Sequence, residues 1–273
     1  MTKVTIIGAE GFVGSAFAAH LSGLDGLETV LVTRRNYPDT VGTESDVVIE
    51  AACNSRKYLA DQQPAKEFDL SVTHRLRTLR DFPADLHVHI SSVDVYSDLT
   101  SPEFTQEDSV PDITKVSHYG FHKLLGEQAV QHYSHRWLIV RLAGMVGLGL
   151  RKNPVYDILN GEPLRIHPNS QYQFMDTADV ARITWKLLER GVTGEIFNLC
   201  GEGLISPSTI SGLAGREMNL SMLEPMVQPR IVNINIQKIS RIASIPDTCE
   251  TVTRFIGAYS KPKEIDGRRS WAT

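Results

Sequence analysis

The stretch Val4-Thr5-Ile6-Ile7-Gly8-Ala9-Glu10-Gly11-Phe12-Val13-Gly14 decides the fold of this chain. Its apolar first part, Val4–Ile7, predicts a buried strand. A glycine-rich turn follows, and the periodicity of Val13–Leu21 then predicts a helix. A strand, a tight turn and a helix in this order are typical of the first unit of a nucleotide-binding α/β sheet.

The three glycines of this turn have the spacing G-x-x-G-x-x-G. Gly8 permits the tight turn, Gly11 lets the backbone approach a pyrophosphate, and Gly14 lets helix and strand pack closely. The helix then presents unpaired N–H groups to the phosphates. We therefore predict that the turn, with its residues Phe12 and Val13, binds a dinucleotide.

Apolar runs alternate with helix-period segments along the rest of the chain. Strands this apolar are typical of a parallel sheet that helices cover on both faces. The further predicted strands are Thr29–Thr33, Val47–Ala51, Leu86–Ser91, Leu138–Leu142 and Ile196–Leu199. The further predicted helices are Glu67–Arg80, Tyr119–Tyr133 and Thr177–Arg190, the last capped by Asp176 or Thr177 and ended by Gly191. The predicted fold is α/β, a Rossmann-like doubly wound parallel sheet with a small C-terminal substrate lobe.

The regular alternation of strands and helices is broken in two places, and the second of them sets the predicted domain limits. Residues 34–46 are too few for a full helix-and-strand step, so one such step is shortened or lost. Residues 151–175 and 201–273 contain more Pro and Gly and have less regular periodicity, so residues 151–273 are predicted to form mainly the substrate lobe. Residues 1–150 form the dinucleotide domain, together with a strand and a helix near residues 174–200.

Composition excludes several classes of protein. The chain has 273 residues, a net charge of -4 and no long basic stripe, which argues against nucleic acid as a partner. No apolar run is long enough to span a membrane, and the chain enters a strand at once without a signal peptide. Three widely spaced cysteines lack metal-binding spacing and fit a reducing cytoplasm, where we expect the protein. No metal site is predicted, because His87 and His89 lack a third ligand.

The end of the second predicted strand distinguishes between the two nicotinamide cofactors. NAD-binding proteins place an acidic residue there to hold the ribose hydroxyls. Here Thr33, Arg34 and Arg35 follow the strand, and two guanidinium groups suit a 2′-phosphate. The sequence favours NADP(H), with NAD as the alternative.

A second group of residues predicts proton transfer beside the dinucleotide. Tyr119 and Lys123 are four apart on a predicted helix and share one face. The lysine ammonium is expected to lower the pKa of the phenol and to bind the nicotinamide ribose. Ser92, at the end of the preceding strand, is expected to donate a hydrogen bond to the substrate. Tyr119 is the predicted general acid and base.

These motifs together resemble the extended short-chain dehydrogenase/reductase family, of the NAD-dependent epimerase/dehydratase type. The resemblance covers nearly the whole chain. The glycine turn, the serine four residues before Tyr96, and Tyr119 with Lys123 all match. Leu138–Gly147 resembles the family's "LRxxxVYG" segment, with Arg141 and Gly147 retained, Phe174–Val180 its "hVxDva" segment, and Glu195–Leu199 its "geiyNl" strand. The family's "HxAA" stands here as Glu50-Ala51-Ala52-Cys53.

The resemblance implies roles for further residues. Ala51 and Ala52 are expected to contact the cofactor with Lys123, and Asp94 and Arg141 to contact the substrate with Ser92 and Tyr119. The implied substrate is a small molecule, a nucleotide-linked sugar, and the implied oligomer a homodimer formed through Glu67–Arg80 and Tyr119–Tyr133. The arginine that usually grips the substrate diphosphate is absent, and Val93 replaces one member of the acidic pair of dehydratases.

Three functions stay open at this level. The first is an NADP(H)-dependent reductase of a keto-sugar, which Arg34 and Arg35 favour. The second is a nucleotide-sugar epimerase that retains NAD, because Ser92, Tyr119 and Lys123 serve both reactions. The third is a dinucleotide-sensing regulator without chemistry, which the intact trio disfavours.

Overall fold

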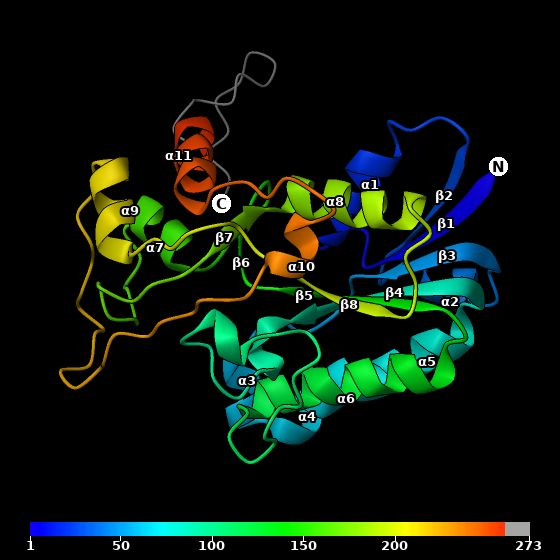
Figure 1. Cartoon of the computed structure of the whole chain (residues 1–273), viewed down its shortest axis with the longest axis horizontal. Coiled ribbons are helices and arrows are strands. Elements are labelled where there is room, and N and C mark those ends of the chain that lie inside the picture. Colours follow the sequence, from blue (N-terminus) through cyan, green and yellow to red (C-terminus); the bar gives the residue numbers. More distant parts are fainter. Residues whose placement is uncertain (260–273) are drawn as a thin grey trace.

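A computed structural model describes residues 1–259 and places a six-stranded parallel sheet at the centre of the molecule (Figure 1). The strand order is β2-β1-β3-β4-β5-β8, and every neighbouring pair is parallel. The strands are β1 Thr2–Ile7, β2 Leu27–Val32, β3 Ser45–Glu50, β4 Ala84–Ser92, β5 Trp137–Leu142 and β8 Glu195–Leu199. The predicted fold class is confirmed.

Helices cover both faces of this sheet. On one face α1 (Gly14–Leu21) contacts α8 (Thr177–Glu189), and their apolar side chains pack on β1, β4 and β5 in the largest core cluster. On the other face α5 (His74–Asp81) contacts α6 (His118–Tyr133). The two layers lie above and below the sheet in Figure 1. Asp176 caps α8 as predicted, accepting a hydrogen bond from the Ala178 N–H at 2.8 Å.

One step of the alternation is reduced to a single turn, as the short segment after β2 predicts. Only α2 (Tyr37–Thr40) separates β2 from β3, and β2 is the edge of the sheet. The usual 3-2-1-4-5-6 strand order therefore lacks its outermost strand. Asn36 turns the chain back at this point, because its side chain accepts from the Thr33 N–H at 2.6 Å and donates to the Leu31 carbonyl at 2.9 Å.

The helix predicted over Glu67–Arg80 is interrupted. After α3 (Tyr58–Gln62), α4 begins at Pro64 and ends at Phe68, a π-helical turn occupies Asp69–Thr73, and α5 follows. The buried Glu67 carboxylate inside this irregular stretch accepts hydrogen bonds from the Ser71 hydroxyl and from His122 of α6. Apolar periodicity does not encode such side-chain bonds, so the sequence predicts one regular helix where the structure has three segments.

A second, smaller core lies beyond the carboxyl ends of the strands. It joins the short parallel pair β6 (Gly144–Val146) and β7 (Phe174–Asp176) to three helices. The helices are α7 Pro154–Asn160, α9 Pro207–Ala214 and α11 Thr248–Tyr259. The short helix α10 (Gln237–Ser240) instead contacts β8, and 3₁₀ turns occupy Val93–Val95 and Pro102–Phe104. The three helices of this core fall within the predicted lobe of residues 151–273, of which 260–273 lie outside the described residues. The division into two domains and the substrate-binding role of the lobe stay predictions.

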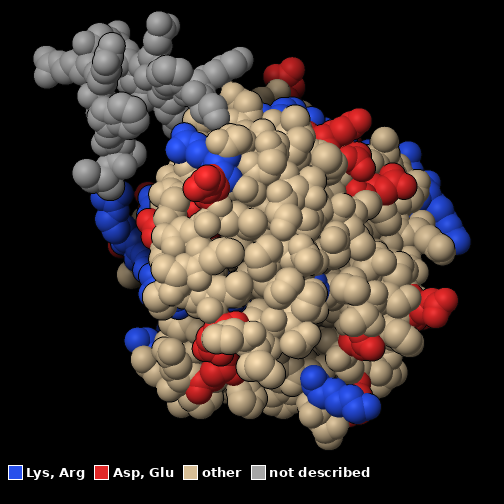
Figure 2. Space-filling model, turned by 90° about the vertical axis from the view of Figure 1, so that its left-hand side faces the viewer, with Lys and Arg blue, Asp and Glu red and all other residues tan. Residues whose placement is uncertain are grey.

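The surface of the lobe end carries scattered charge. In Figure 2, which shows this end, large uncharged areas separate small groups of acidic and basic side chains, and no basic stripe crosses this face. Among residues 1–259 no helix is long and apolar enough to cross a membrane. Within the same range no three His, Cys, Asp or Glu residues are grouped so that they hold a metal ion.

Candidate active site

The glycine turn leaves no room for side chains, which is the property a dinucleotide cradle needs. Gly8 has a φ of +82°, and a Cβ there would lie 2.8 Å from the backbone nitrogen of Ala52. A Cβ on Gly14 would lie 2.1 Å from the Gly8 carbonyl oxygen, and one on Gly11 3.0 Å from the same atom. The turn thus packs against the N-terminus of α1 and against the residues after β3, and the chain here fits a pyrophosphate.

The two arginines predicted to bind a 2′-phosphate lie exposed just after β2. Among the described residues Arg35 makes one loose ion pair, with Glu10 of the glycine turn at 3.5 Å, and both side chains face solvent. Arg34 is also exposed. The N–H and the hydroxyl of Thr33 both donate hydrogen bonds to the Asn36 side chain. The residue that follows β2 is thus a threonine and not an acidic residue. Both guanidinium groups are thus exposed beside the turn, and their binding of a 2′-phosphate stays a prediction.

Close backbone contact brings α6 onto the end of β4. Gly120 follows Tyr119 on this helix, and a Cβ there would lie 1.9 Å from the Asp94 carbonyl oxygen. Ser117 caps the helix by accepting from the Gly120 N–H at 3.1 Å. The Lys123 ammonium, which is buried, donates to the Ile90 carbonyl of β4 at 2.9 Å. Ser92, Tyr119 and Lys123 are therefore brought together at the carboxyl end of β4, as the sequence predicts.

The protonation state of the phenol differs from the prediction. The pKa of Tyr119 is raised well above its ordinary value, first by burial and then by Cys53, Asp94 and Glu67 nearby. The expected lowering of the pKa by Lys123 is thus wrong for this arrangement, because burial and the acidic neighbours raise the pKa, while the Lys123 ammonium donates to the Ile90 carbonyl. The Tyr119 hydroxyl makes no hydrogen bond within residues 1–259, so the protonated phenol is free to donate to a ligand.

Asp94 is part of the site and holds Ser92. The Ser92 hydroxyl donates to the Asp94 carboxylate at 2.7 Å. The same carboxylate pairs with Lys57 at 2.5 Å and with Arg230 of the lobe at 3.4 Å. Burial raises the pKa of Asp94, but Lys57, Ser92 and Arg230 offset it, and the pKa is held below its ordinary value. Asp94 is therefore ionised and fixes the orientation of the Ser92 hydroxyl.

The residues after β3 depend on a buried ion pair that sequence reasoning missed. Glu50 accepts from the Ala52 N–H at 3.0 Å through one carboxylate oxygen and pairs with Arg75 of α5 at 2.9 Å through the other. Both charged side chains are almost fully buried. Ala51 and Ala52 thus lie beside the glycine turn, where they were predicted. The sequence does contain one indication of this pair, a glutamate at the end of an apolar strand. A carboxylate buried there needs a cationic partner, but the sequence does not identify which cation provides it.

Arg141 is not brought to the site. Its guanidinium forms two hydrogen bonds with Glu127 of α6, at 3.0 and 2.7 Å, and a third with the Tyr96 hydroxyl at 2.8 Å. Only 3% of the Arg141 surface is exposed. The structure therefore corrects its predicted role in substrate binding: the guanidinium is committed to the buried layer between β5 and α6.

The comparisons with known proteins agree with this architecture. Residues 4–200 match the NAD dependent epimerase/dehydratase family. No curated protein sequence matches the chain.

Solved structures of the same fold include both epimerases and reductases. The chain resembles UDP-glucuronic acid 4-epimerase from Bacillus cereus, solved as a mutant with a fluorinated substrate analogue and NAD, at a TM-score of 0.75 and 19% identity, over 94% of this chain and 99% of that one. It resembles dTDP-4-dehydrorhamnose reductase from Bacillus anthracis, solved with NADP, at a TM-score of 0.76 and 16% identity. The match covers 94% of this chain and 98% of that one. It also resembles RMD from Pseudomonas aeruginosa, solved with NADPH, at a TM-score of 0.75 and 20% identity. The match covers 94% of this chain and 98% of that one.

The family match spans more than half of the chain and includes the glycine turn, Ser92, Tyr119 and Lys123. The chain belongs to the NAD-dependent epimerase/dehydratase family, and its cofactor is a nicotinamide dinucleotide.

Proposed function

We propose that this protein is an NADP(H)-dependent reductase of a keto-sugar that is linked to a nucleotide. The observation that carries the cofactor choice is the exposed pair Arg34 and Arg35 after β2, where NAD-binding relatives place a carboxylate. Within residues 1–259 Arg35 has only Glu10 as a partner, at 3.5 Å between exposed side chains, and a 2′-phosphate displaces such a pair readily. NADPH is the usual reductant of cells, so this choice supports reduction.

The residues of the site suit proton donation to a carbonyl. A bound nicotinamide supplies hydride to the carbonyl carbon or takes it back. The Tyr119 phenol, kept protonated by its raised pKa, donates its proton to the carbonyl oxygen. The buried Lys123 ammonium donates one proton to the Ile90 carbonyl at 2.9 Å and keeps two for the nicotinamide ribose. The Ser92 hydroxyl donates its single proton to Asp94 here, so it hydrogen-bonds the substrate carbonyl oxygen only when that proton turns from the carboxylate to the substrate.

A cofactor measurement tests this assignment first. Freshly purified protein, denatured and examined by mass spectrometry, is expected to release NADP(H) or no dinucleotide. NADPH is expected to bind at least tenfold more tightly than NADH, and the double variant Arg34→Ala/Arg35→Ala is expected to lose most of that preference. Arg136→Ala, at the other end of the sheet, removes a charge without approaching the cofactor and is the control.

Near-stoichiometric NAD in the purified protein contradicts the reductase assignment and favours the epimerase. A preference for NADH that survives the double substitution removes the 2′-phosphate argument. In either case substrate screening turns to nucleotide sugars without added reductant.

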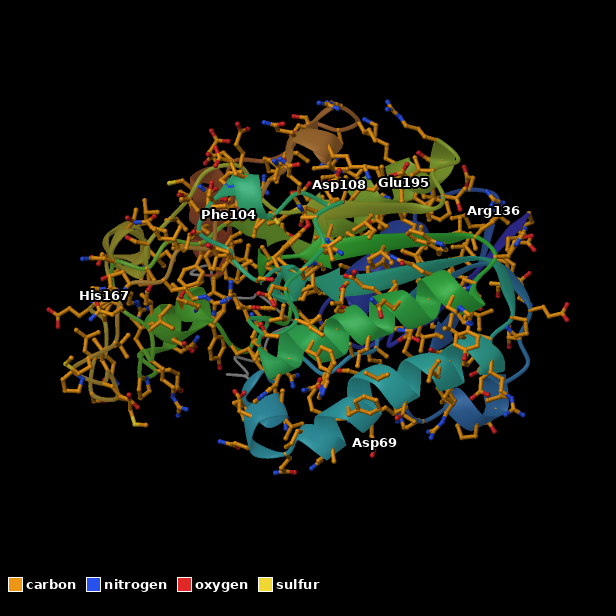
Figure 3. All side chains as sticks on the ribbon, turned by 60° about the horizontal axis from the view of Figure 1, so that its bottom comes forward. Asp69, Phe104, Asp108, Arg136, His167 and Glu195 are labelled. Atoms are coloured by element: carbon orange, nitrogen blue, oxygen red, sulfur yellow. The ribbon has the colours of Figure 1, made fainter. Side chains whose placement is uncertain are left out.

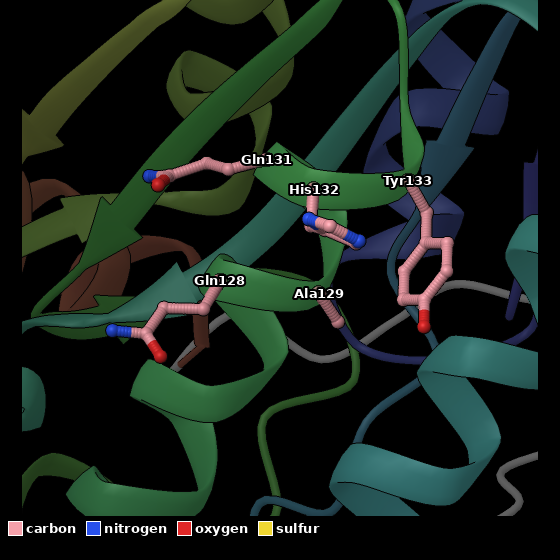
Figure 4. A pocket seen from close by; sticks show the side chains of 5 residues that line it. All are labelled: Gln128, Ala129, Gln131, His132 and Tyr133. Carbon is pink, nitrogen blue, oxygen red and sulfur yellow. The ribbon is translucent and has the colours of Figure 1, made fainter.

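A homodimer stays a proposal, supported by the outer face of the helix pair α4–α5 and α6. Phe68, Leu70 and Leu76 are exposed there although they are apolar. A surface hollow at the end of α6 is lined by Gln128, Ala129, Gln131, His132 and Tyr133 (Figure 4). Light scattering is expected to give twice the chain mass, and Leu76→Asp to return one chain mass. A monomer at micromolar concentration contradicts the proposal.

A further inference from the structure

Four cationic side chains from three separate segments lie near one another: Lys57 and Arg230 pair with Asp94, and Arg56 and Lys152 lie near Lys57. Arg56 and Lys57 precede α3, Lys152 precedes α7, and Arg230 lies in the lobe. Lys57 and Arg230 bind opposite oxygens of the Asp94 carboxylate, at 2.5 and 3.4 Å. The Lys152 ammonium donates to the Ser55 carbonyl, which places it beside the same segment.

The charges of this cluster are not balanced. Asp94 is the one carboxylate that forms an ion pair with any of the four within residues 1–259. The pKa of Lys152 is lowered by burial first and then by the positive charges of Lys57 and Arg56, although Cys53 opposes the shift. Like charges held together in this way lower their mutual repulsion by binding an anion.

The cluster lies beside Ser92 and Tyr119, which we call the reacting end of the site, and not at the glycine turn. The Lys57 ammonium is 5.8 Å from the centre of the Tyr119 ring. It shares one Asp94 oxygen with the Ser92 hydroxyl. Lys57 and Arg230 thus flank the serine and the tyrosine, while the pyrophosphate cradle is formed by Gly8 and its neighbours.

We propose that this site binds a substrate with an anionic group, a carboxylate or a phosphate, close to the reacting carbon, and that Lys57 and Arg230 hold that group. The inference rests on the proposed function in taking Ser92 and Tyr119 as the reacting end. Lys57 and Arg230 are each about half exposed, with side-chain exposures of 58% and 51%, so a ligand reaches them without unfolding the site. A neutral substrate of the same shape gains nothing from them.

Anion binding to the cofactor-loaded protein tests this proposal without any turnover. The protein is saturated with NADP⁺, which blocks the phosphate site at the start of α1, and is titrated calorimetrically with inorganic phosphate or acetate at constant ionic strength. Acetamide is the neutral counterpart of acetate. We expect saturable binding of phosphate, acetate or both, none of acetamide, and at least tenfold weaker anion binding in Lys57→Gln and in Arg230→Gln.

Arg136→Gln is the charge-matched control, because Arg136 lies just before β5, at the end of the sheet away from the lobe residue His167 in Figure 3. Anion binding equal to that of the unchanged protein is expected for this variant. Absence of saturable binding, or binding that survives both substitutions, overturns the proposal. A weakened affinity for NADP⁺ in Lys57→Gln also overturns it, because the cluster then serves the cofactor. If the purified protein holds NAD instead, the same titration is run on the NAD-loaded protein, so failure of the reductase assignment leaves this result unaffected and the two are told apart.

Discussion

Replacing Tyr119 with phenylalanine is expected to lower the rate of hydride transfer from NADPH by roughly 10²- to 10⁴-fold, the usual contribution of a positioned general acid. The substitution removes one hydroxyl that makes no hydrogen bond within residues 1–259. The fold and the affinity for NADPH are therefore expected to change little. Single-turnover absorbance with a nucleotide-linked keto-sugar, at saturating NADPH, measures the step itself.

A matched control separates chemistry from packing. Tyr133 ends the same helix, is exposed, and lies far along it from Lys123. Tyr133→Phe is expected to leave the rate unchanged. The two variants should also melt within a few degrees of the unchanged protein. Turnover that survives Tyr119→Phe would remove the catalytic assignment and return the regulator hypothesis to consideration.

The pH dependence follows from the direction of the pKa shift. Because the pKa of Tyr119 is raised, the phenol stays protonated through neutral and mildly alkaline pH. Carbonyl reduction by the unchanged enzyme is therefore expected to hold its rate there and to fall only as the phenol ionises. The reverse oxidation needs the phenolate and is expected to rise in the same direction of pH.

Arg141→Met is expected to lower the free energy of unfolding by about 3–5 kcal/mol, because it leaves the Glu127 carboxylate buried without its cation. Burial lowers the pKa of Arg141, but Glu127 and Tyr96 more than offset it, and the pKa lies above its ordinary value. The guanidinium is thus charged and fully bonded. Urea unfolding measures the loss, provided that the transition is a single cooperative one.

Two comparisons decide whether burial of the charge is the cause. The double variant Glu127→Leu/Arg141→Met removes both charges and is expected to recover a large part of the stability. Arg182→Met breaks an exposed ion pair with Asp179 and is expected to cost less than about 1 kcal/mol. If Arg141→Met instead leaves stability unchanged and raises the KM for substrate, the guanidinium binds substrate after all.

Local patterns in the sequence determined the frame of this protein. The run Val4–Ile7 with Gly8 and Gly14 specified a strand, a turn without side chains and a helix, because each of these depends on neighbouring residues only. The segment 34–46 was too short for a full helix-and-strand step, and the structure has a single turn of helix there. Tyr119 and Lys123 shared a helix face through their spacing alone.

The tertiary structure decided which charged groups meet. Glu50 forms an ion pair with Arg75, and Glu127 forms one with Arg141. Asp94 pairs with Arg230, which lies 136 positions away in the sequence. No periodicity encodes such pairs, since they depend on how strands and helices pack and on which buried charge needs a partner. The same packing raises the pKa of Tyr119 and so keeps the phenol protonated. It buries Arg141 in the core, where the sequence predicted a substrate contact, and it places Lys57 beside the Tyr119 ring. The sequence by itself determined the sheet, the glycine turn and the positions of the candidate residues Ser92, Tyr119 and Lys123, whereas burial and long-range pairing determined the charges of the candidate site.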